Sequence, residues 1–383
     1  MIRLAILGST GSVGQQALDV VRALPDTFEV VALAAGGNTG LLSTQVREFR
    51  PAAAFARPGH DSDALRAEAS VEWQPLDVIA TRDDVDVVLV ATSGLAALPA
   101  TIAALRAGKR VAIANKETLV VGGPAVRAAL DAGRTLGAEL RPVDSEHSAI
   151  WQCLWGEAPE NVDRLTLTAS GGAFRDYDPA ALDAVTAEQA LAHPTWKMGP
   201  KITIDSATLF NKGLEAIEAR WLFDIPLDRI DILQHRESVV HSMVTFRDGS
   251  VKAQLGEPDM RLPIQVALTY PDRGASKPVS DLDLAKRGSL TFGTVDAARF
   301  PALGVALEAG LRDDTSAAAV SGADEAAVAH FLAGRIRFTE IARLLAQALD
   351  AHAAQRTGDL NALLAAEAWG RQFVDSRVAA GVR

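Results

Sequence analysis

The sequence predicts an α/β protein: a Rossmann-like, doubly wound parallel sheet, followed by an α+β domain and a small C-terminal helical domain. Short, continuously apolar runs alternate with helical patterns over the first part of the chain. Strands that are apolar on both faces lie between layers of helices, as in parallel sheets. From about residue 300 onward the pattern is helical and rich in Ala and Leu, with core spacing at Ile341, Leu344, Leu345 and Leu349.

The predicted strands of the sheet are short apolar runs at 2–7, 30–35, 86–91 and 110–114, and an Ala-rich helix near 96–107 separates the last two. Ser93-Gly94 and Asn115-Lys116 follow strand ends. Ligands of open parallel sheets bind outside those carboxyl ends, so these positions are candidate ligand contacts.

Four segments follow from these patterns. Residues 1–144 carry the parallel sheet, and 145–270 are less regular and hold most polar motifs. A polar stretch that starts at Arg273 marks a linker over 271–298, and 299–383 form the helical domain. The length of 383 residues also predicts more than one domain, because it exceeds the usual size of a single core.

Composition excludes several classes of protein. A hydrophobic content of 48% with 22% charged residues is ordinary for a globular enzyme. The net charge of −10 argues against non-specific nucleic-acid binding, which needs a basic surface. No apolar run approaches the roughly 20 residues that span a bilayer, so no membrane partner is expected. The single cysteine, Cys153, and the absence of a leader pattern before the first strand predict a cytoplasmic protein.

A glycine turn at Gly8-Ser9-Thr10-Gly11-Ser12-Val13-Gly14 lies between a strand and a helix. Glycines permit close approach of a phosphate to the helix N-terminus, whose N–H groups and dipole favour anions. The spacing is G-x-x-G-x-x-G, less specific than G-x-G-x-x-G, and an ordinary strand-to-helix turn is the alternative.

The end of the second strand indicates the cofactor. NAD enzymes usually place an acidic residue there, on the ribose hydroxyls. This chain has Gly36-Gly37-Asn38, with no carboxylate to repel a 2′-phosphate, so NADP is favoured.

Three carboxylates predict a metal site. Asp144 and Glu146 are two residues apart and share a face if the segment is an extended strand. Glu215 shares a face with Asn211 and Lys212 if 206–221 are helical. Carboxylate oxygens favour magnesium or manganese over zinc. The alternatives are solvated surface acids and a plain ion pair between Lys212 and Glu215.

Two loops complete the candidate site. Ser170-Gly171-Gly172 offers a hydroxyl and backbone N–H groups for phosphate, although a plain turn fits as well. The segment from His193 to Gly199 contains Pro194 and Trp196 and fits a mobile lid, or a fixed loop with a core tryptophan. We expect His147 and His241 to be structural.

Five motifs in register resemble the 1-deoxy-D-xylulose 5-phosphate reductoisomerases nearly end to end: 8–14, 114–117, 144–150, 193–215 and 254–261. The resemblance implies conversion of 1-deoxy-D-xylulose 5-phosphate, a sugar phosphate, to 2-C-methyl-D-erythritol 4-phosphate in isoprenoid-precursor biosynthesis. Retro-aldol and aldol steps would yield an aldehyde that NADPH reduces. It further implies a divalent metal (Mn²⁺ or Mg²⁺, with Co²⁺ as a further candidate) and a homodimer.

The resemblance also implies roles for single residues. Metal ligands are Asp144, Glu146 and Glu215, which with Lys116 form the catalytic set. Substrate contacts are Lys116, Ser145, Glu146, Ser170, His193, Trp196, Ser206, Asn211, Lys212 and Glu215. Cofactor contacts are Thr10, Gly11, Ser12, Val13, Gly36, Gly37, Asn38, Asn115, Glu117 and Gly199.

The chain departs from the family at two places. Members often carry a basic residue where this chain has Gly37, which leaves the source of NADP preference open, with Arg57 as a weak candidate. Residues 321–325 read Ser-Gly-Ala-Asp-Glu in place of Asn-Ala-Ala-Asn-Glu.

Other functions stay open beside this one. Aspartate-semialdehyde dehydrogenases share the opening turn and need a cysteine nucleophile, but Cys153 lies in an apolar helical context typical of inert thiols. A different NADP-dependent oxidoreductase and a catalytically silent NADP sensor remain as alternatives.

Overall fold

The computed structural model describes residues 1–59, 71–194, 196, 198–274 and 279–381. Part of the predicted linker, 275–278, and Thr195 and Lys197 of the predicted lid lie outside these residues. The described chain forms two compact units. The first unit comprises Met1–Thr118, Ala125–Ser148 and Asp259–Ser280, and the second comprises Leu119–Pro124, Ala149–Pro258 and Asp281–Arg383.

The first unit is built on a parallel sheet. In the described residues its strands have the order β4-β3-β2-β1-β5-β6-β7 and every pairing is parallel. The strands are β1 (Ile2–Leu7), β2 (Phe28–Ala35), β3 (Ala53–Ala56), β4 (Glu72–Trp73), β5 (Val87–Val90), β6 (Arg110–Ile113) and β7 (Glu139–Pro142). The order reverses at β1, where ligands of doubly wound sheets bind.

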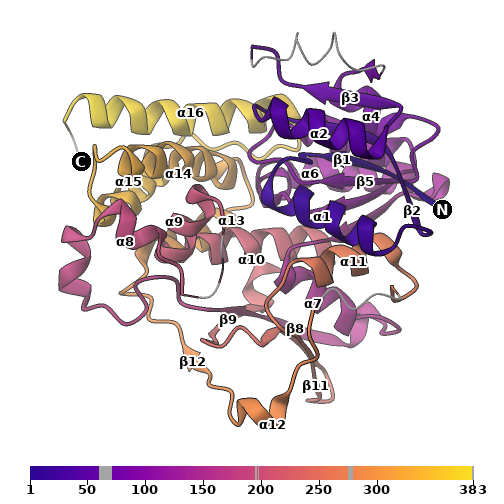
Figure 1. Cartoon of the computed structure of the whole chain (residues 1–383). Coiled ribbons are helices and arrows are strands. Elements are labelled where there is room, and N and C mark those ends of the chain that lie inside the picture. Colours follow the sequence, from indigo (N-terminus) through magenta and orange to yellow (C-terminus); the bar gives the residue numbers. More distant parts are fainter. Residues whose placement is uncertain (60–70, 195, 197, 275–278, 382–383) are drawn as a thin grey trace. The chain divides into compact units, whose positions relative to one another are not determined.

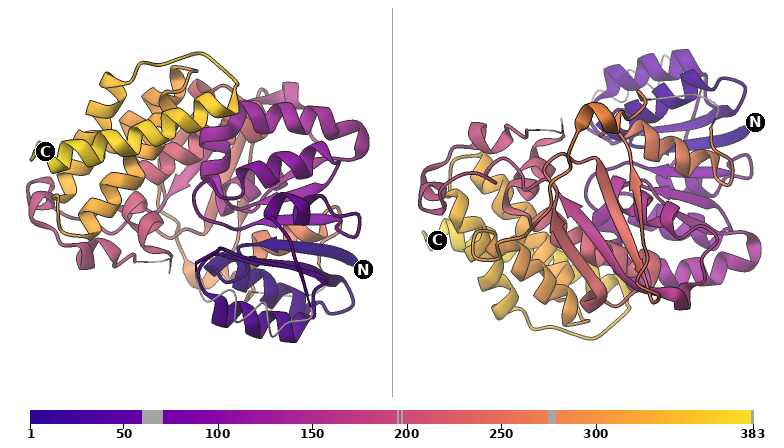
Figure 2. Two further views of the ribbon diagram at one scale, coloured as in Figure 1. Left: turned by 90° about the horizontal axis from the view of Figure 1, so that it is seen from above. Right: turned by 90° about the horizontal axis from the view of Figure 1, so that it is seen from below.

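Helices cover both faces of this sheet (Figures 1 and 2). They are α1 (Ser12–Ala23), α2 (Thr39–Phe49), α4 (Leu76–Thr81), α5 (Leu98–Arg106), α6 (Lys116–Gly133) and α11 (Arg261–Thr269), and α7 (Ser145–Cys153) follows β7. The strands are apolar because both faces are buried: Val87, Val88, Leu89 and Val90 have no exposed surface. The predicted parallel, doubly wound sheet is confirmed.

Helix α11 joins the first unit although it comes late in the chain. It packs against α1, and the buried Arg141 guanidinium of β7 donates to Ala267 O at 3.0 Å. Ile264, Ala267 and Leu268 belong to the same apolar core as Leu4, Ile6 and Leu89. The segment predicted as 145–270 therefore contributes to both units, and the boundaries at 144, 270 and 298 stay a prediction.

The second unit contains a mixed sheet, seen in the right-hand view of Figure 2. In the described residues its order is β11-β10-β8-β9-β12, and only the β8–β9 pairing is parallel. The strands are β8 (Val162–Ala169), β9 (Ile230–Gln234), β10 (Val240–Phe246), β11 (Val251–Leu255) and β12 (Gly293–Thr294). This sheet confirms the predicted α+β part of the chain.

Helices form the rest of the second unit. They are α8 (Ala187–Leu191), α9 (Pro200–Thr208), α10 (Phe210–Phe223), α12 (Leu284–Arg287), α13 (Pro301–Leu311), α14 (Ser316–Leu332), α15 (Phe338–Ala351) and α16 (Leu360–Ala379). Short 3₁₀ helices lie at 159–161, 179–184 and 227–229 in this unit and at 134–136 in the first. Ile341, Leu344, Leu345 and Leu349 of α15 are buried, as their spacing predicts.

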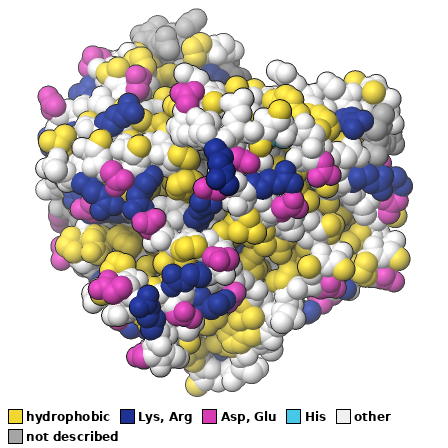
Figure 3. Space-filling view, turned by 180° about the vertical axis from the view of Figure 1, so that it is seen from behind, with side chains coloured by type: hydrophobic (Ala, Val, Ile, Leu, Met, Phe, Trp, Pro, Cys, Tyr) yellow, Lys and Arg dark blue, Asp and Glu magenta, His cyan; other side chains and the backbone are white. Residues whose placement is uncertain are grey.

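The surface carries charges of both signs. On the face that Figure 3 shows, Lys and Arg side chains are interspersed with Asp and Glu. Among the described helices, none is long and apolar enough to cross a membrane.

Candidate active site

The glycine turn after β1 is held by close backbone contacts. Gly8 has a φ of 101°, and a Cβ there would stand 2.4 Å from Ala91 O. A Cβ on Gly14 would stand 2.2 Å from Gly8 O. Gly11 is the N-cap of α1 and has no side chain to satisfy the helix's first N–H groups. The turn therefore presents backbone N–H donors at a helix N-terminus, which suits a phosphate.

The end of β2 begins a second helix. Asn38 is the N-cap of α2, and its Oδ1 accepts from Leu41 N at 3.1 Å. The buried Ser9 hydroxyl donates to Gln45 Oε1 at 2.7 Å, which ties the glycine turn to α2. Thr10, Gly11, Ser12, Val13, Gly36, Gly37 and Asn38 thus lie at the carboxyl ends of β1 and β2, where a dinucleotide is expected.

Asn115 and Lys116 follow β6, as predicted. The Asn115 side chain accepts from Thr118 N at 2.8 Å and donates to Thr92 O and Gly94 O, both at 2.7 Å. These bonds join the loops after β5 and β6. The Asn115 side chain has a structural role that the sequence did not reveal. Glu117 lies half-buried in the first turn of α6.

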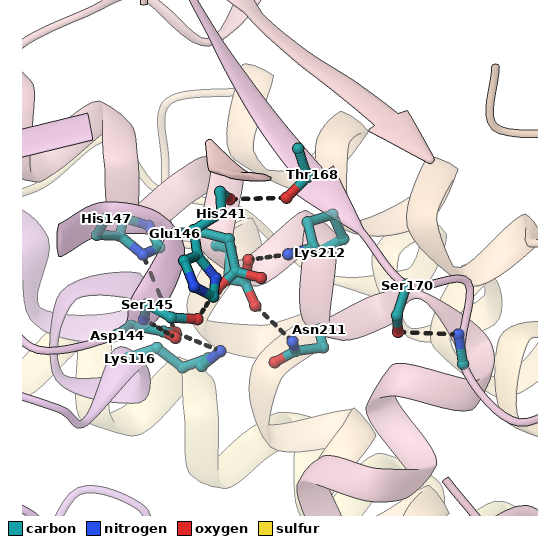
Figure 4. A network of polar contacts seen from close by, with 12 residues as sticks. Lys116, Asp144, Ser145, Glu146, His147, Thr168, Ser170, Asn211, Lys212 and His241 are labelled. Atoms are coloured by element: carbon teal, nitrogen blue, oxygen red, sulfur yellow. Dashed lines mark hydrogen bonds and ion pairs between the residues drawn. The ribbon is translucent and has the colours of Figure 1, made fainter. Parts of the chain in front are cut away.

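Lys116 is a buried cation in the first unit. The residue is 5% exposed, and its ammonium lies 2.8 Å from Asp144 Oδ2 (Figure 4). An ordinary surface lysine would keep its charge in water. Lys116 is therefore a buried partner of Asp144, and its role at the substrate stays a prediction.

Asp144 and Glu146 do not lie on a strand, and that prediction is wrong. Strand β7 ends at Pro142, and Asp144 begins a helix: its carbonyl accepts from Ser148 N at 2.8 Å and Glu146 lies in the first turn of α7. Asp is a preferred N-cap, and acids in a first turn favour the helix dipole. The Ser145 hydroxyl donates to Glu146 Oε2 at 2.6 Å.

The helix predicted over 206–221 is interrupted, which is a second correction. Leu209 has a φ of 55°, so α9 ends at Thr208 and α10 begins at Phe210. A left-handed leucine costs roughly 1–2 kcal/mol. Packing of buried Leu209 with Ala169, Phe300 and Leu303 offsets this cost. The break changes the direction of the chain between Ser206 and Asn211.

Asn211, Lys212 and Glu215 share one face of α10, as predicted. Glu215 accepts from Asn211 Nδ2 and from Lys212 Nζ. The alternative of an ion pair within the helix is thus present, but it is not solvated. Lys212 is 3% exposed and Glu215 is 2% exposed. Burying a charged pair is costly, so simple helix stabilisation does not explain it.

The Ser170 turn contacts α9. Gly171 and Gly172 have φ of 89° and 68°, which side chains rarely adopt. A Cβ on Gly172 would stand 2.4 Å from Ser206 O, so only glycine lets the turn approach Ser206 this closely. The Ser170 turn therefore lies against the part of α9 that holds Ser206, and a phosphate site shared with Asn211 and Lys212 of α10 stays a prediction.

His193 contacts the same turn. Its Nδ1 accepts from Trp196 N at 2.9 Å, and its Nε2 lies 3.1 Å from Ser170 Oγ. Burial, helped by Arg175, lowers the pKa of His193 to about 4, so the ring is neutral at pH 7. Because Nδ1 accepts, Nε2 carries the proton and donates to Ser170. The Ser170 hydroxyl is then free to donate its own proton to a ligand.

Two further residues of the predicted lid segment are described by the structure. Trp196 is half-buried beside His193, and Gly199 is the exposed N-cap of α9 in the second unit. The roles of Trp196 as a lid residue and of Gly199 as a cofactor contact stay predictions.

Two buried histidines, one in each unit, were expected to be structural. His147 is fully buried, with Nδ1 4.0 Å from Asp144 Oδ2. His147 follows Asp144 by three residues, a spacing that brings side chains together on a helix. The predicted strand at Asp144 obscured this relation. His241 of β10 is buried, and burial lowers its pKa to about 4. No sequence pattern marked it.

Cys153 lies buried in α7, and burial raises the pKa of its thiol to about 11. Such a thiol is a poor nucleophile. This agrees with the expectation of an inert cysteine and leaves an aspartate-semialdehyde-type mechanism without its nucleophile.

Where residues 321–325 depart from the family, the structure has a buried acid. Asp324 of α14 has no exposed surface and lies 3.0 Å from Lys201 Nζ of α9. Asp205 lies 2.6 Å from the same ammonium. Two carboxylates therefore share one cation, and burial raises the pKa of Asp324 above its ordinary value.

We expect Asp324→Asn to change how stability depends on pH. A buried acid with a raised pKa binds more protons folded than unfolded, so its contribution to stability falls as pH rises above the ordinary Asp pKa of about 3.9. The neutral amide lacks this loss. Thermal unfolding of the variant should occur at a higher temperature than that of the parent at pH 8, with a smaller difference at pH 5. Asp350→Asn, at an exposed position of α15, is the control. Parallel pH profiles for parent and Asp324→Asn would contradict the assignment.

Family models match the chain in three parts. Residues 4–123 match the 1-deoxy-D-xylulose 5-phosphate reductoisomerase model, 140–223 match its C-terminal domain, and 255–373 match the DXP reductoisomerase C-terminal domain.

Curated relatives match over nearly the whole chain. The 1-deoxy-D-xylulose 5-phosphate reductoisomerase of Heliobacterium modesticaldum is 48% identical and covers 99% of this chain and 98% of its own. That of Shouchella clausii is 50% identical over 92% of this chain and 94% of its own.

Solved structures agree with the sequence relatives. The reductoisomerase from Zymomonas mobilis in complex with NADPH has a TM-score of 0.90 at 39% identity, covering 98% of this chain and 99% of that one. A DOX-P reductoisomerase in complex with NADPH, fosmidomycin and magnesium has a TM-score of 0.93 at 36% identity, covering 99% and 98%. By sequence along its length and by fold, the chain belongs to the 1-deoxy-D-xylulose 5-phosphate reductoisomerase family.

Proposed function

We propose that this protein converts 1-deoxy-D-xylulose 5-phosphate to 2-C-methyl-D-erythritol 4-phosphate with NADPH and a divalent metal. One observation carries the proposal: relatives named for this enzyme match 99% of the chain at 48% identity. The buried polar groups of both units support it, because the family motifs that hold them are complete apart from the departures at Gly37 and 321–325.

We assign Asp144, Glu146 and Glu215 to the metal. The donor set fits a hard divalent cation, since all three side chains are carboxylates. In the structure, Lys116 neutralises Asp144 and Lys212 neutralises Glu215, so each lysine can turn to an anionic substrate once a cation takes its place. When bound, the cation polarises substrate oxygens and stabilises negative charge that develops on them.

The phosphate end of the substrate is assigned to α9, α10 and the Ser170 turn. In this assignment Lys212 supplies a positive charge, and Ser206 and Asn211 supply hydrogen bonds. The Ser170 hydroxyl donates to the phosphate while its oxygen accepts from His193 Nε2. Charge-assisted hydrogen bonds of this kind are stronger than neutral ones and fix orientation. We further assign Lys116 and Ser145 to the reacting end of the substrate and Trp196 to its cover.

The direct test is to mix the protein with NADPH, Mg²⁺ or Mn²⁺ and 1-deoxy-D-xylulose 5-phosphate, and to identify the product by NMR. Formation of 2-C-methyl-D-erythritol 4-phosphate with one NADPH oxidised supports the proposal. A different reduced product would favour another NADP-dependent oxidoreductase. Tight NADPH binding without turnover of this substrate would favour a silent NADP sensor.

NADPH should be preferred over NADH. No carboxylate follows β2 at Gly36, Gly37 or Asn38, so nothing there repels a 2′-phosphate. We expect the efficiency with NADPH to exceed that with NADH by about tenfold or more, the value of one charge-assisted contact. Initial rates at matched cofactor concentrations measure this ratio. A ratio of one would mean that the end of β2 had been misinterpreted.

We also propose a homodimer in the cytoplasm. The family resemblance supports the homodimer, as do three exposed apolar side chains of the second unit, Val251, Leu284 and Phe292. A single, reduced cysteine is consistent with the cytoplasm. Sedimentation equilibrium gives the assembly state, and a monomer at micromolar concentration would exclude the dimer.

A further inference from the structure

The 2′-phosphate of NADPH needs a cation that the end of β2 does not provide. Enzymes that use NADP commonly place an arginine near this phosphate. Gly36, Gly37 and Asn38 carry no charge, and Asn38 Oδ1 already accepts from Leu41 N. We therefore expect a positively charged side chain on another strand, at the carboxyl end of the same parallel sheet.

Strand β3 ends beside β2. The two strands pair in parallel, with Ala35 opposite Ala56, and Arg57 N donates to Ala35 O at 3.2 Å. Arg57 is therefore the next residue along β3, level with Gly36 on β2. Neighbouring strands lie about 4.8 Å apart, so the arginine starts within reach of anything bound over Gly36.

The local sequence keeps Arg57 in this position. Pro58 follows it, and a residue before proline is held in an extended conformation. Ala56, the last residue of β3, is buried, and Arg57 is exposed, so the buried part of this strand ends directly before the arginine. The arginine thus extends the direction of β3 just beyond the carboxyl end of the strand.

Within the part of the chain that the structure describes, the Arg57 guanidinium makes no hydrogen bond or ion pair. Arg3, Arg22 and Arg82 of the first unit each pair with a carboxylate, at 2.8 Å, 2.7 Å and 2.7 Å. Within residues 1–59 and 71–148 of this unit, no carboxylate or carbonyl accepts from the Arg57 side chain. Toward these described residues its five donors are uncommitted, and a guanidinium of this kind suits a phosphate.

Gly36, level with Arg57, leaves open space among the described residues. No heavy atom of these residues would lie within 4 Å of a Cβ added to Gly36, and its φ lies outside the left-handed region. Glycine here leaves room, and does not relieve strain. The N-terminus of α2 begins three residues later, and its dipole favours an anion at the same place.

We propose that Arg57 binds the 2′-phosphate of NADPH and sets the preference for NADPH, supplying from β3 the cation that β2 lacks at Gly37. The proposal rests on the proposed function, in which NADPH is the reductant. It makes Arg57 a specificity-determining residue for the cofactor, with no part in the chemistry of the sugar phosphate.

Binding, measured without turnover, tests the proposal. NADPH, NADH and 2′,5′-ADP are titrated into the full-length protein and into Arg57→Ala by calorimetry. We expect the Kd for NADPH and for 2′,5′-ADP to rise roughly ten- to a hundredfold in the variant, and the Kd for NADH to stay within about twofold. Arg57→Lys should recover part of the loss, and Arg57→Glu should favour NADH.

Arg50→Ala is the matched control. Arg50 precedes β3 as Arg57 follows it, so it is an exposed arginine at the opposite edge of the same sheet. Its removal should leave all three Kd values unchanged. Equal Kd values for NADPH and NADH in the parent protein would refute the proposed cofactor preference itself. A parent that prefers NADPH, with an unchanged preference in Arg57→Ala or an equal loss of NADH binding, would overturn the role of Arg57 alone.

Discussion

Glu215→Gln should reduce metal-dependent turnover by at least about 100-fold, because loss of groups that only support a metal ligand already costs 10–100-fold. Glutamine keeps the size of the side chain and its hydrogen bond with Asn211 but removes the negative charge that we assign to the cation. Rates are measured across a titration of Mn²⁺ or Mg²⁺, beside calorimetric Kd values for the metal and for NADPH. The Kd for NADPH should not change, since the glycine turn belongs to the first unit.

Glu308→Gln is the control for this prediction. Glu308 also pairs with a cation of its own helix, Arg312 at 2.6 Å, but its side chain is 59% exposed. Its removal should cost only about 0.2–0.5 kcal/mol of stability and leave turnover alone. Parent-like activity of Glu215→Gln at limiting metal would remove Glu215 from the metal site.

Lys212→Ala should raise the Michaelis constant for the sugar phosphate by about 10–100-fold, the loss expected for a charge-assisted hydrogen bond to a phosphate. Some turnover should be lost as well, through misorientation of the substrate. Steady-state kinetics over a wide substrate range separate the two effects. The Kd for NADPH should remain that of the parent.

The burial of Lys212 adds a consequence for stability. Removing one partner of a buried ion pair costs about 3–5 kcal/mol, because Glu215 is left with an uncompensated charge. The double variant Lys212→Ala, Glu215→Gln removes that charge too. Its thermal stability should return to nearly that of the parent, while its Michaelis constant for the sugar phosphate should stay raised. An unchanged Michaelis constant in a folded Lys212→Ala protein would make Lys212 a structural cation.

The sequence predicted the parts of the molecule that follow from periodicity. Strands β1, β2, β5 and β6 are buried on both faces, so their apolar runs are continuous and easily recognised. The face shared by Asn211, Lys212 and Glu215 follows from helical spacing alone. Both predictions depend only on residues near one another in the chain.

Two local errors have physical causes that spacing cannot show. Asp144 and Glu146 fit a strand by their separation of two, but Asp144 caps a helix. Leu209 breaks a helix although leucine is a good helix former, because a distant apolar cluster holds it in the left-handed conformation. The structural role of Asn115 could not be predicted either, because its side chain donates to Thr92 O and Gly94 O in the loop after a different strand, β5.

Helix α10 carries, on adjacent turns, the lysine assigned to phosphate and the carboxylate assigned to the metal. Three residues of helix advance about 4.5 Å along the axis, and a helix cannot stretch. Gly213 lies between them, where a Cβ would stand 2.4 Å from Ala306 of α13, so the neighbouring helix clamps this stretch. With both assignments, α10 fixes the distance between the group that binds phosphate and a carboxylate that binds the metal. Only a sugar phosphate with the matching number of carbons between its phosphate and its chelating oxygens would reach both groups, so the enzyme would select substrates by chain length before any chemistry begins.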